Sequence, residues 1–253
     1  MRHFFTILSH EIRTLLFNPS TYVAAVLFLG VMGFIFAGIL DSYSRTPQET
    51  PPAAVFFQLF WIPVFFMVPL LTMKSLAEER RLGTLETLLT APVTTTEVVL
   101  GKFGAAYFLY LLLWGSTAGF HFVLHYYARD IRFIDAGPLL GGYLFIALSG
   151  LLFVAVGILA SALARTQAVA GILSFTALFG LIIGLRFFGE SALLQQDSFL
   201  TLKNTVESLQ IFRHLEDFTN GIVDTRQVFF YLTGSILALI FSILGVEAKL
   251  LQG

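Results

Sequence analysis

The chain has 253 residues, of which 57% are apolar and only 12% are charged, and its mean hydropathy is +0.82. Ordinary soluble domains carry about 25% charged residues, so a soluble fold could not keep this much apolar surface away from water. The net charge of −1 argues against a nucleic-acid partner, and the absence of cysteine excludes disulfides and thiolate metal sites. We therefore expect an all-α integral membrane protein that forms one domain over residues 1–253.

Residues 1–20 are amphipathic and precede the first apolar stretch. Four apolar side chains recur there at helical spacing: Phe4, Leu8, Ile12 and Leu15. Pro19 ends this helix, because proline cannot continue it from within. The pattern predicts an interfacial helix on the cytoplasmic leaflet of the membrane. The alternative is a frayed extension of the first span.

Six stretches have the roughly 20 apolar residues that a helix needs to cross the bilayer. They run from about Tyr22 to Leu40, Val55 to Met73, Phe103 to Leu124, Leu139 to Ala164, Ala168 to Phe188 and Phe229 to Val246. Pro63 and Pro69 predict kinks or breaks in the second span. Gly180 and Gly184 form a small-xxx-small pattern that permits close helix approach, and packing within the chain is the default interpretation.

The distribution of Lys and Arg in the short loops predicts the orientation. One side holds eight cations, at Arg2, Arg13, Lys74, Arg80, Arg81, Lys102, Arg165 and Lys249, and the short loops of the other side hold three, at Arg45, Arg129 and Arg132. This places both termini in the cytoplasm. An even number of spans leaves both ends of a chain on the same side of the membrane, so six spans agree with this orientation. We expect a multi-pass protein of the cytoplasmic membrane.

The segments outside the bilayer differ in character. Residues 41–54 are polar and Pro-rich, and we interpret them as an external loop that only connects two spans. In the long external segment 189–226, four apolar residues at helical spacing predict a helix at the membrane surface: Phe199, Leu202, Val206 and Leu209. Asn220-Gly221 is a turn signal ahead of the last span.

The cytoplasmic segment 74–102, between spans two and three, is the most informative. It holds the densest charge cluster of the chain, Glu78 to Arg81, after which Gly83 breaks the run. Three leucines form an apolar stripe on a short helix that Pro92 stops: Leu85, Leu88 and Leu89. An exposed Leu stripe beside charges suggests a docking surface, and a solvated loop is the alternative.

A new helix begins after this stripe and leads into the third span. Thr94 and Glu97 have the spacing of a capping box, with Val93 and Val98 as its hydrophobic staple. The sequence therefore predicts a short helix between two breaks, with longer helices on either side.

Two motifs carry a resemblance to a known family. The stretch ERRLGTLETLLTAPV (residues 79–93) resembles the pattern E-[KR]-x-x-G-T-x-E-x-L-L-x-x-P-[VI] of ABC-2 type transporter permeases. The stretch LEDFTNGIVDTRQVFFYL (residues 215–232) is similar to a segment ahead of the last span in the gliding-motility (GldF-like) and copper-enzyme-maturation (NosY-like) branch. Gln227 departs from that pattern, which commonly has Asp. The resemblance extends over nearly the whole chain. The amphipathic start, the six spans, the charged second cytoplasmic loop and the long last external loop follow one another in the same order as in the family.

The resemblance implies a permease, the membrane half of an ATP-binding cassette transporter, that pairs with a second copy or a related permease. A separate cytoplasmic ATPase would bind ATP, and a membrane-anchored protein with an external domain would join a gliding-type complex. The sequence agrees, since it lacks a G-x-x-x-x-G-K-[ST] phosphate loop. We expect no cofactor, metal or catalytic residue in this chain. The family's coupling interface maps onto Glu79, Arg80, Arg81, Gly83, Thr84, Leu85, Glu86, Leu88, Leu89 and Pro92.

Two other functions compete with this interpretation. His121 and His125 share one helical face, so they could bind a metal or haem in an intramembrane enzyme, although no carboxylate or cysteine completes a site locally. A secondary transporter would normally place an ionisable residue inside a span, and the predicted spans are almost free of them.

Overall fold

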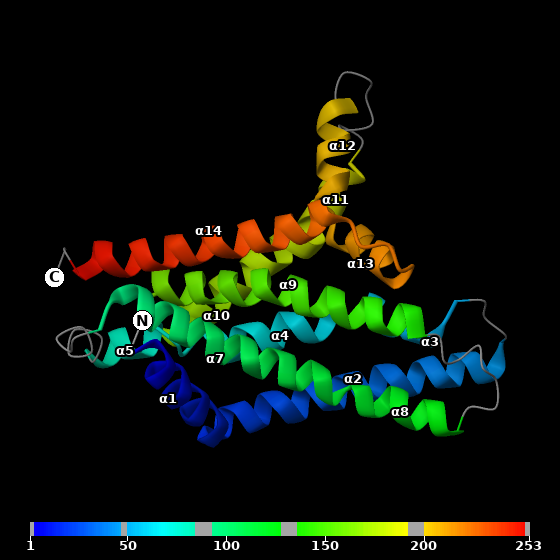
Figure 1. Ribbon diagram of the computed structural model, residues 1–253, viewed down its shortest axis with the longest axis horizontal. Coiled ribbons are helices and arrows are strands. Elements are labelled where there is room, and N and C mark those ends of the chain that lie inside the picture. Colours follow the sequence, from blue (N-terminus) through cyan, green and yellow to red (C-terminus); the bar gives the residue numbers. More distant parts are fainter. Residues whose placement is uncertain (1–2, 47–49, 84–92, 128–135, 192–199, 251–253) are drawn as a thin grey trace.

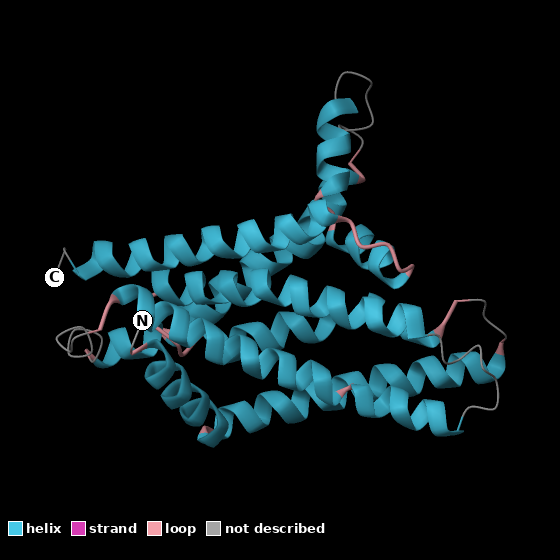
Figure 2. Cartoon of the chain, in the orientation of Figure 1, coloured by secondary structure: helices cyan, strands magenta, loops and turns pink. Residues whose placement is uncertain are grey.

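The computed structural model describes residues 3–46, 50–83, 93–127, 136–191 and 200–250, and helices are the only regular secondary structure in these ranges (Figure 2). Six helical segments are long and apolar enough to cross a membrane: Pro19–Arg45, Trp61–Leu82, Thr95–Tyr126, Ala136–Leu163, Gln167–Gly189 and Thr225–Ala248. The predicted all-α fold with six spans is therefore confirmed.

Helix α9 (Ala136–Leu163) is the centre of the bundle. It packs against α4 (Trp61–Thr72), α7 (Thr95–Ser116), α10 (Gln167–Phe179), α13 (Ile211–Thr219) and α14 (Thr225–Leu250). Three of its glycines let neighbouring side chains approach its backbone. A Cβ atom would lie 2.1 Å from the Phe57 ring at Gly142, 2.3 Å from the Tyr110 ring at Gly150, and 2.4 Å from the Thr72 hydroxyl at Gly157. These contacts explain why such an apolar helix carries so many small residues.

Helix α1 (Phe4–Phe17) meets α2 (Pro19–Arg45) at a sharp turn. Asn18 forms the turn, and its side-chain Oδ1 accepts a hydrogen bond from the Ser20 N–H at 3.1 Å, while Pro19 takes the first position of α2. The predicted end of the amphipathic helix is confirmed. In Figure 1, α1 lies at the same end of the bundle as α5 (Ala77–Leu82) and the end of α14 (Thr225–Leu250).

The second span is broken just ahead of Pro63, as predicted, whereas the helix continues through Pro69. Helix α3 (Pro52–Gln58) ends before α4 (Trp61–Thr72), and the break lies at Leu59 and Phe60. Pro63 has no N–H to donate to the Leu59 carbonyl four residues earlier, and that carbonyl accepts instead from the Ile62 N–H at 3.2 Å. Helix α4 continues through Pro69 to Thr72.

The third span also divides, which the sequence analysis did not predict. Helix α7 (Thr95–Ser116) is followed by α8 (Ala118–Tyr127), with Thr117 between them. The Thr117 hydroxyl donates to the Trp114 carbonyl at 2.6 Å and lies 2.9 Å from the Tyr143 hydroxyl. Such local side-chain bonds compete with the helical backbone ladder. The span predicted from Phe103 to Leu124 is confirmed within Thr95–Tyr126, with a one-residue interruption at Thr117.

The fifth span changes its helical type near its end. Helix α10 (Gln167–Phe179) passes through a π-helical turn, η2 (Gly180–Gly184), into α11 (Leu185–Gly189). Within the described ranges no atom lies within 4 Å of a Cβ built on Gly180, and at Gly184 only the Phe179 carbonyl does, at 3.8 Å. The expected packing of this glycine pair within the chain was therefore wrong.

The long segment before the last span forms two helices rather than one. Helix α12 (Leu200–Ser208) projects away from the bundle (Figure 1), and α13 (Ile211–Thr219) packs against α9. Of the predicted apolar stripe, Val206 is buried within the protein, Leu209 follows the end of α12, and Phe199 lies outside the described residues. The Asn220-Gly221 turn is confirmed, since Gly221 adopts a φ of 79° that glycine tolerates without strain.

Candidate functional site

The short helix α5 is fastened to the end of α9 by one hydroxyl group. The backbone N–H groups of Leu76 and Ala77 both donate to Oγ of Ser161, at 3.0 and 3.1 Å. The first N–H groups of a helix have no partner within it, and here a buried serine of another helix satisfies two such groups. The start of α5 is thereby fixed to the bundle.

Arg80 fixes the same helix at a second point. Its Nη1 atom donates to the carbonyl of Ala164 at 2.6 Å, just after the last residue of α9. Carbonyl groups at a helix end lack partners and carry partial negative charge, so a guanidinium stabilises that end. Helix α5 then stops at Gly83, whose φ of 69° is the left-handed conformation that glycine adopts readily.

A buried lysine joins three helices at this end of the bundle. The Lys102 ammonium on α7 lies 2.7 Å from Oε1 of Glu11 on α1 and 2.7 Å from Oε1 of Glu79 on α5. Its side chain is only 3% exposed. A buried cation is costly unless it is paired and hydrogen-bonded, and both carboxylates meet that requirement. The three helices are therefore held together by ionic contacts.

Helix α1 packs closely against α7 beside this lysine. Gly101 leaves room for Ile7, since a Cβ atom at position 101 would lie 2.7 Å from Ile7 Cγ2. A Cβ atom at Gly104 would lie 3.0 Å from Leu8 Cδ1. The amphipathic helix thus uses part of its apolar face for packing within the protein. The amphipathic pattern predicts a helix on the membrane surface and does not indicate this attachment to α7.

The beginning of α7 is capped as the sequence predicts. The Thr94 hydroxyl accepts from the Glu97 N–H at 3.2 Å, and the Glu97 carboxylate accepts from the Thr94 N–H at 3.3 Å. This reciprocal pair is a capping box. Residues 84–92 therefore connect two helices whose facing ends are both fixed.

The structure locates four of the ten residues predicted for the coupling interface. Glu79 and Arg80 turn towards Lys102 and α9, whereas Arg81 is 55% exposed along its side chain, 4.0 Å from Glu78. Gly83 ends α5. The other six lie outside the described residues: Thr84, Leu85, Glu86, Leu88, Leu89 and Pro92.

Sequence reasoning missed Glu11, Lys102 and Ser161 as members of this site. Lys102 was counted only as a cytoplasmic charge, although a lysine at the start of an apolar span needs an anionic partner when it is buried. Glu11 is the one carboxylate of the amphipathic helix, and this made it a candidate partner for a buried cation such as Lys102. Nothing in the sequence around Ser161 distinguishes it from other small residues of its span.

The two histidines considered for metal or haem both lie on α8, but His121 is buried and His125 is exposed. His121 is buried among aromatic rings, with centroid distances of 4.8 Å to Phe56 and 6.0 Å to Phe57, and its Nδ1 lies 3.4 Å from the Thr117 carbonyl. Among the described residues no three His, Cys, Asp or Glu side chains are grouped so that they could hold a metal ion. The environment of His121 is that of a packed aromatic cluster.

These features define the class of protein. It is a polytopic α-helical membrane protein in which α5, ahead of the connection to the third span, is held against the bundle by hydrogen bonds and an ion pair. The chain belongs to the ABC-2 family of transporter proteins, whose sequence pattern matches residues 5–248. It is therefore a membrane-spanning permease of the ABC transporter class. No curated protein matches the chain significantly.

Proposed function

We propose that this chain moves its substrate across the membrane with ATP hydrolysed by a separate cytoplasmic nucleotide-binding subunit, which docks on residues 84–92 and their flanks. The family supports the permease assignment, and the sequence has no phosphate loop of its own. In this proposal Leu85, Leu88 and Leu89 supply the apolar contact, and Arg81, which is exposed, contributes charge at the rim.

The observation that carries the proposal is the bridge at Lys102. A displacement of residues 84–92 acts on α5 at one end and on α7 at the other, and Lys102 ties both helices to each other and to α1. Ser161 and the Ala164 carbonyl pass the displacement of α5 on to α9. Elements joined in this way move as a rigid body, which is what the transmission of an ATPase stroke requires.

Three further assignments belong to the proposal. The excess of Lys and Arg at the end that holds α1 and α5 supports cytoplasmic termini in the inner membrane. A chain with six spans supports a transporter built from two permease copies, or from this chain and a related one. The motif in residues 215–232 supports a place in the GldF-like and NosY-like branch, with a partner that carries an external domain.

The test is co-purification with the cognate nucleotide-binding subunit, followed by measurement of ATP turnover. The complex should contain two copies of each subunit, and the chain alone should not hydrolyse ATP. Leu88→Asp should release the ATPase or uncouple its turnover from transport, because each buried leucine contributes roughly 1.5–3 kcal/mol to such a contact.

A matched change at the opposite end of the bundle serves as the control. Thr46→Asp introduces the same charge at an exposed position after α2, and should leave both the complex and its turnover unchanged. If Leu88→Asp retained wild-type co-purification and coupled turnover, residues 84–92 would be a solvated connector and the docking proposal would fail.

A further inference from the structure

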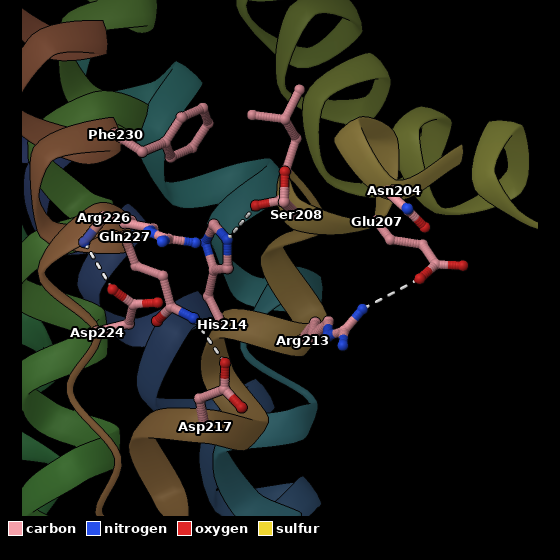
Figure 3. A pocket seen from close by; sticks show the side chains of 11 residues that line it. Asn204, Glu207, Ser208, Arg213, His214, Asp217, Asp224, Arg226, Gln227 and Phe230 are labelled. Atoms are coloured by element: carbon pink, nitrogen blue, oxygen red, sulfur yellow. Dashed lines mark hydrogen bonds and ion pairs between the residues drawn. The ribbon is translucent and has the colours of Figure 1, made fainter. Parts of the chain in front are cut away.

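A polar pocket lies at the start of the last span, away from the site around Lys102. It has a volume of about 510 Å³ and is an open pocket lined by residues of α12, α13 and the first turns of α14 (Figure 3). Three carboxylates and two guanidinium groups line it, together with Phe230. Nothing in the proposed ATPase coupling uses this pocket.

Gln227 is the unusual residue of the pocket. Its side chain is more than nine-tenths buried, and its Nε2 atom donates to Oδ2 of Asp217 at 2.6 Å. Its Oε1 atom is buried as well and has no hydrogen-bond partner among the described residues. The opposite amide orientation would set this oxygen against the Asp217 carboxylate, so the hydrogen bond fixes which atom is left over.

The charges around Gln227 Oε1 determine which kind of hydrogen-bond donor can bind to it. Asp224 lies on the other side of Gln227 from Asp217 in the view of Figure 3, and the Arg226 N–H donates to Oδ1 of Asp224 at 2.8 Å. A buried amide oxygen next to two carboxylates repels an anion and attracts a donor with positive charge. Leaving such a buried acceptor unsatisfied is energetically unfavourable.

The pocket favours an organic cation over a metal ion. The guanidinium groups of Arg213 and Arg226 line it too, and each would repel a bound divalent cation. Arg213 is paired with Glu207 at 3.2 Å, whereas Arg226 is exposed at the rim. A guanidinium beside a cation site is suited to a ligand that carries an anionic group next to its cationic one.

The position of the pocket indicates where such a ligand comes from. The last span begins at Thr225, between the pocket residues Asp224 and Arg226. Large apolar side chains beside them are exposed, with Ile222 at 58% and Phe229 at 65%. The end of a span lies near the polar headgroup region of a bilayer, and the exposed Ile222 and Phe229 side chains are available for contact with lipid there. A lipid headgroup is therefore a ligand within reach of the pocket.

We propose that this pocket binds a primary ammonium group, as carried by the phosphoethanolamine headgroup of a membrane lipid. The ammonium N–H groups donate to the carboxylates of Asp217 and Asp224 and to Oε1 of Gln227. The phosphate lies against the Arg226 guanidinium. A phosphocholine headgroup has the same charges but no N–H donor, and it does not satisfy the Gln227 oxygen.

The experiment compares two lipids on the purified full-length chain by native mass spectrometry. Phosphatidylethanolamine should bind about tenfold more tightly than phosphatidylcholine with the same acyl chains, since hydrogen bonds between charged groups are the strong ones. Equal binding of the two lipids overturns the proposal, and this comparison needs no variant.

The double variant Asp217→Asn, Asp224→Asn tests the location of the site. Asparagine keeps a carbonyl oxygen for the Gln227 amide and for the Arg226 N–H, so the local hydrogen bonds persist while both charges are lost. The lipid preference should disappear. Asp41→Asn is the matched control, because Asp41 is exposed and paired with Arg45 at 3.0 Å outside the pocket, and it should keep the preference.

Two additional arms identify the ligand. Displacement of the lipid by soluble phosphoethanolamine shows that the headgroup alone is recognised, and a failure to displace it assigns the site to a membrane lipid with its acyl chains. Calcium is added to the unmodified protein and to the double variant in a separate arm. Calcium binding that is lost in the double variant, without any lipid preference in the unmodified protein, overturns the proposal in favour of a metal site.

Discussion

The Nζ atom of Lys102 lies 2.7 Å from Oε1 of Glu79, although residues 84–92 separate the two helices that carry them. The ion pair thus joins the two helices on either side of this connecting segment. Because the lysine is almost fully buried and Glu79 is 24% exposed, water screens this contact only weakly. The pair therefore makes the position of α5 dependent on the position of α7.

Replacing Lys102 by methionine should destabilise the protein. The change leaves Glu11 and Glu79 close together without a cation, and breaking a buried pair in this way typically costs about 3–5 kcal/mol. Thermal unfolding of the detergent-solubilised protein measures the loss. ATP turnover in the complex should become independent of substrate, since α1 and α5 no longer follow α7.

The triple variant Glu11→Gln, Glu79→Gln, Lys102→Met separates stability from transmission. Without charges to bury, it should recover most of the lost stability, whereas coupling should remain impaired because the ionic bridge is gone. If the triple variant restored full coupling, ordinary packing between the three helices would suffice and the bridge would have no role in transmission.

Gly101→Ala should loosen α1 from α7. A Cβ atom at this position lies 2.7 Å from Ile7 Cγ2, and such overpacking costs roughly 1–3 kcal/mol. The added variant Ile7→Ala should recover part of that loss, which a double-mutant cycle by thermal unfolding measures. Gly115→Ala is the control, since nothing in the described part of the chain beyond the local helix backbone lies within 4 Å of a Cβ there, and it should be neutral or stabilising.

Stability should fall as the pH drops from about 7.5 to 5.5, in part because of His214. Burial lowers the pKa of His214, and Arg213 lowers it further, against the opposing effects of the Ser208 carbonyl, Asp217 and Asp224. The unfolded state then binds a proton at a higher pH than the folded state. The neutral imidazole therefore contributes stability above the unfolded pKa, and that contribution is lost as the pH falls through the folded pKa.

The hydrogen bonds of His214 agree with a neutral ring. Nε2 donates to the Ser208 carbonyl at 2.9 Å, so Nδ1 accepts from the hydroxyl of Tyr231, also at 2.9 Å. His214→Gln should reduce the dependence of the melting temperature on pH between those limits. An unchanged slope would assign the titration to other histidines, which both proteins share.

The orientation can be tested with single cysteines, because the native chain has none. Thr46→Cys and Asn204→Cys place a thiol at exposed positions away from α5 and should react with an impermeant reagent added to intact cells. Arg81→Cys, at an exposed position on α5, should react only after permeabilisation. Labelling of the Arg81 variant in intact cells would reverse the topology and remove the docking proposal.

Much of the fold follows from the sequence, because span length and loop charge are strong signals that a bilayer imposes on a chain. The start of α7 was equally predictable, since a capping box is local. The π-turn of the fifth span and the break at Thr117 were not predictable, because each depends on contacts with other helices or on backbone register.

The site shows the same division. Gly83 and the charge cluster that precedes it are visible as local patterns, so α5 and its end could be predicted. The partners of that cluster could not, since Glu11 is 91 residues from Lys102 and Ser161 is 85 residues from Leu76. Helix α13 could have been found, because Ile211, Leu215 and Phe218 repeat at helical spacing and are buried.

The π-turn at Gly180–Gly184 inserts one residue into the register of the fifth span. An α-helix advances by about 100° per residue, so everything beyond the turn is rotated by about that angle compared with an uninterrupted helix. This rotation aims the Arg186 guanidinium at the Phe212 ring, 5.0 Å from its centroid. Deleting one glycine of this turn would let the segment return to an ordinary α-helix, and because the lost residue and the lost offset cancel, Arg186 would still face Phe212. An alanine inserted elsewhere in the span would instead turn Arg186 away, while the helix remained long enough to cross the bilayer. Hydropathy does not register such a change.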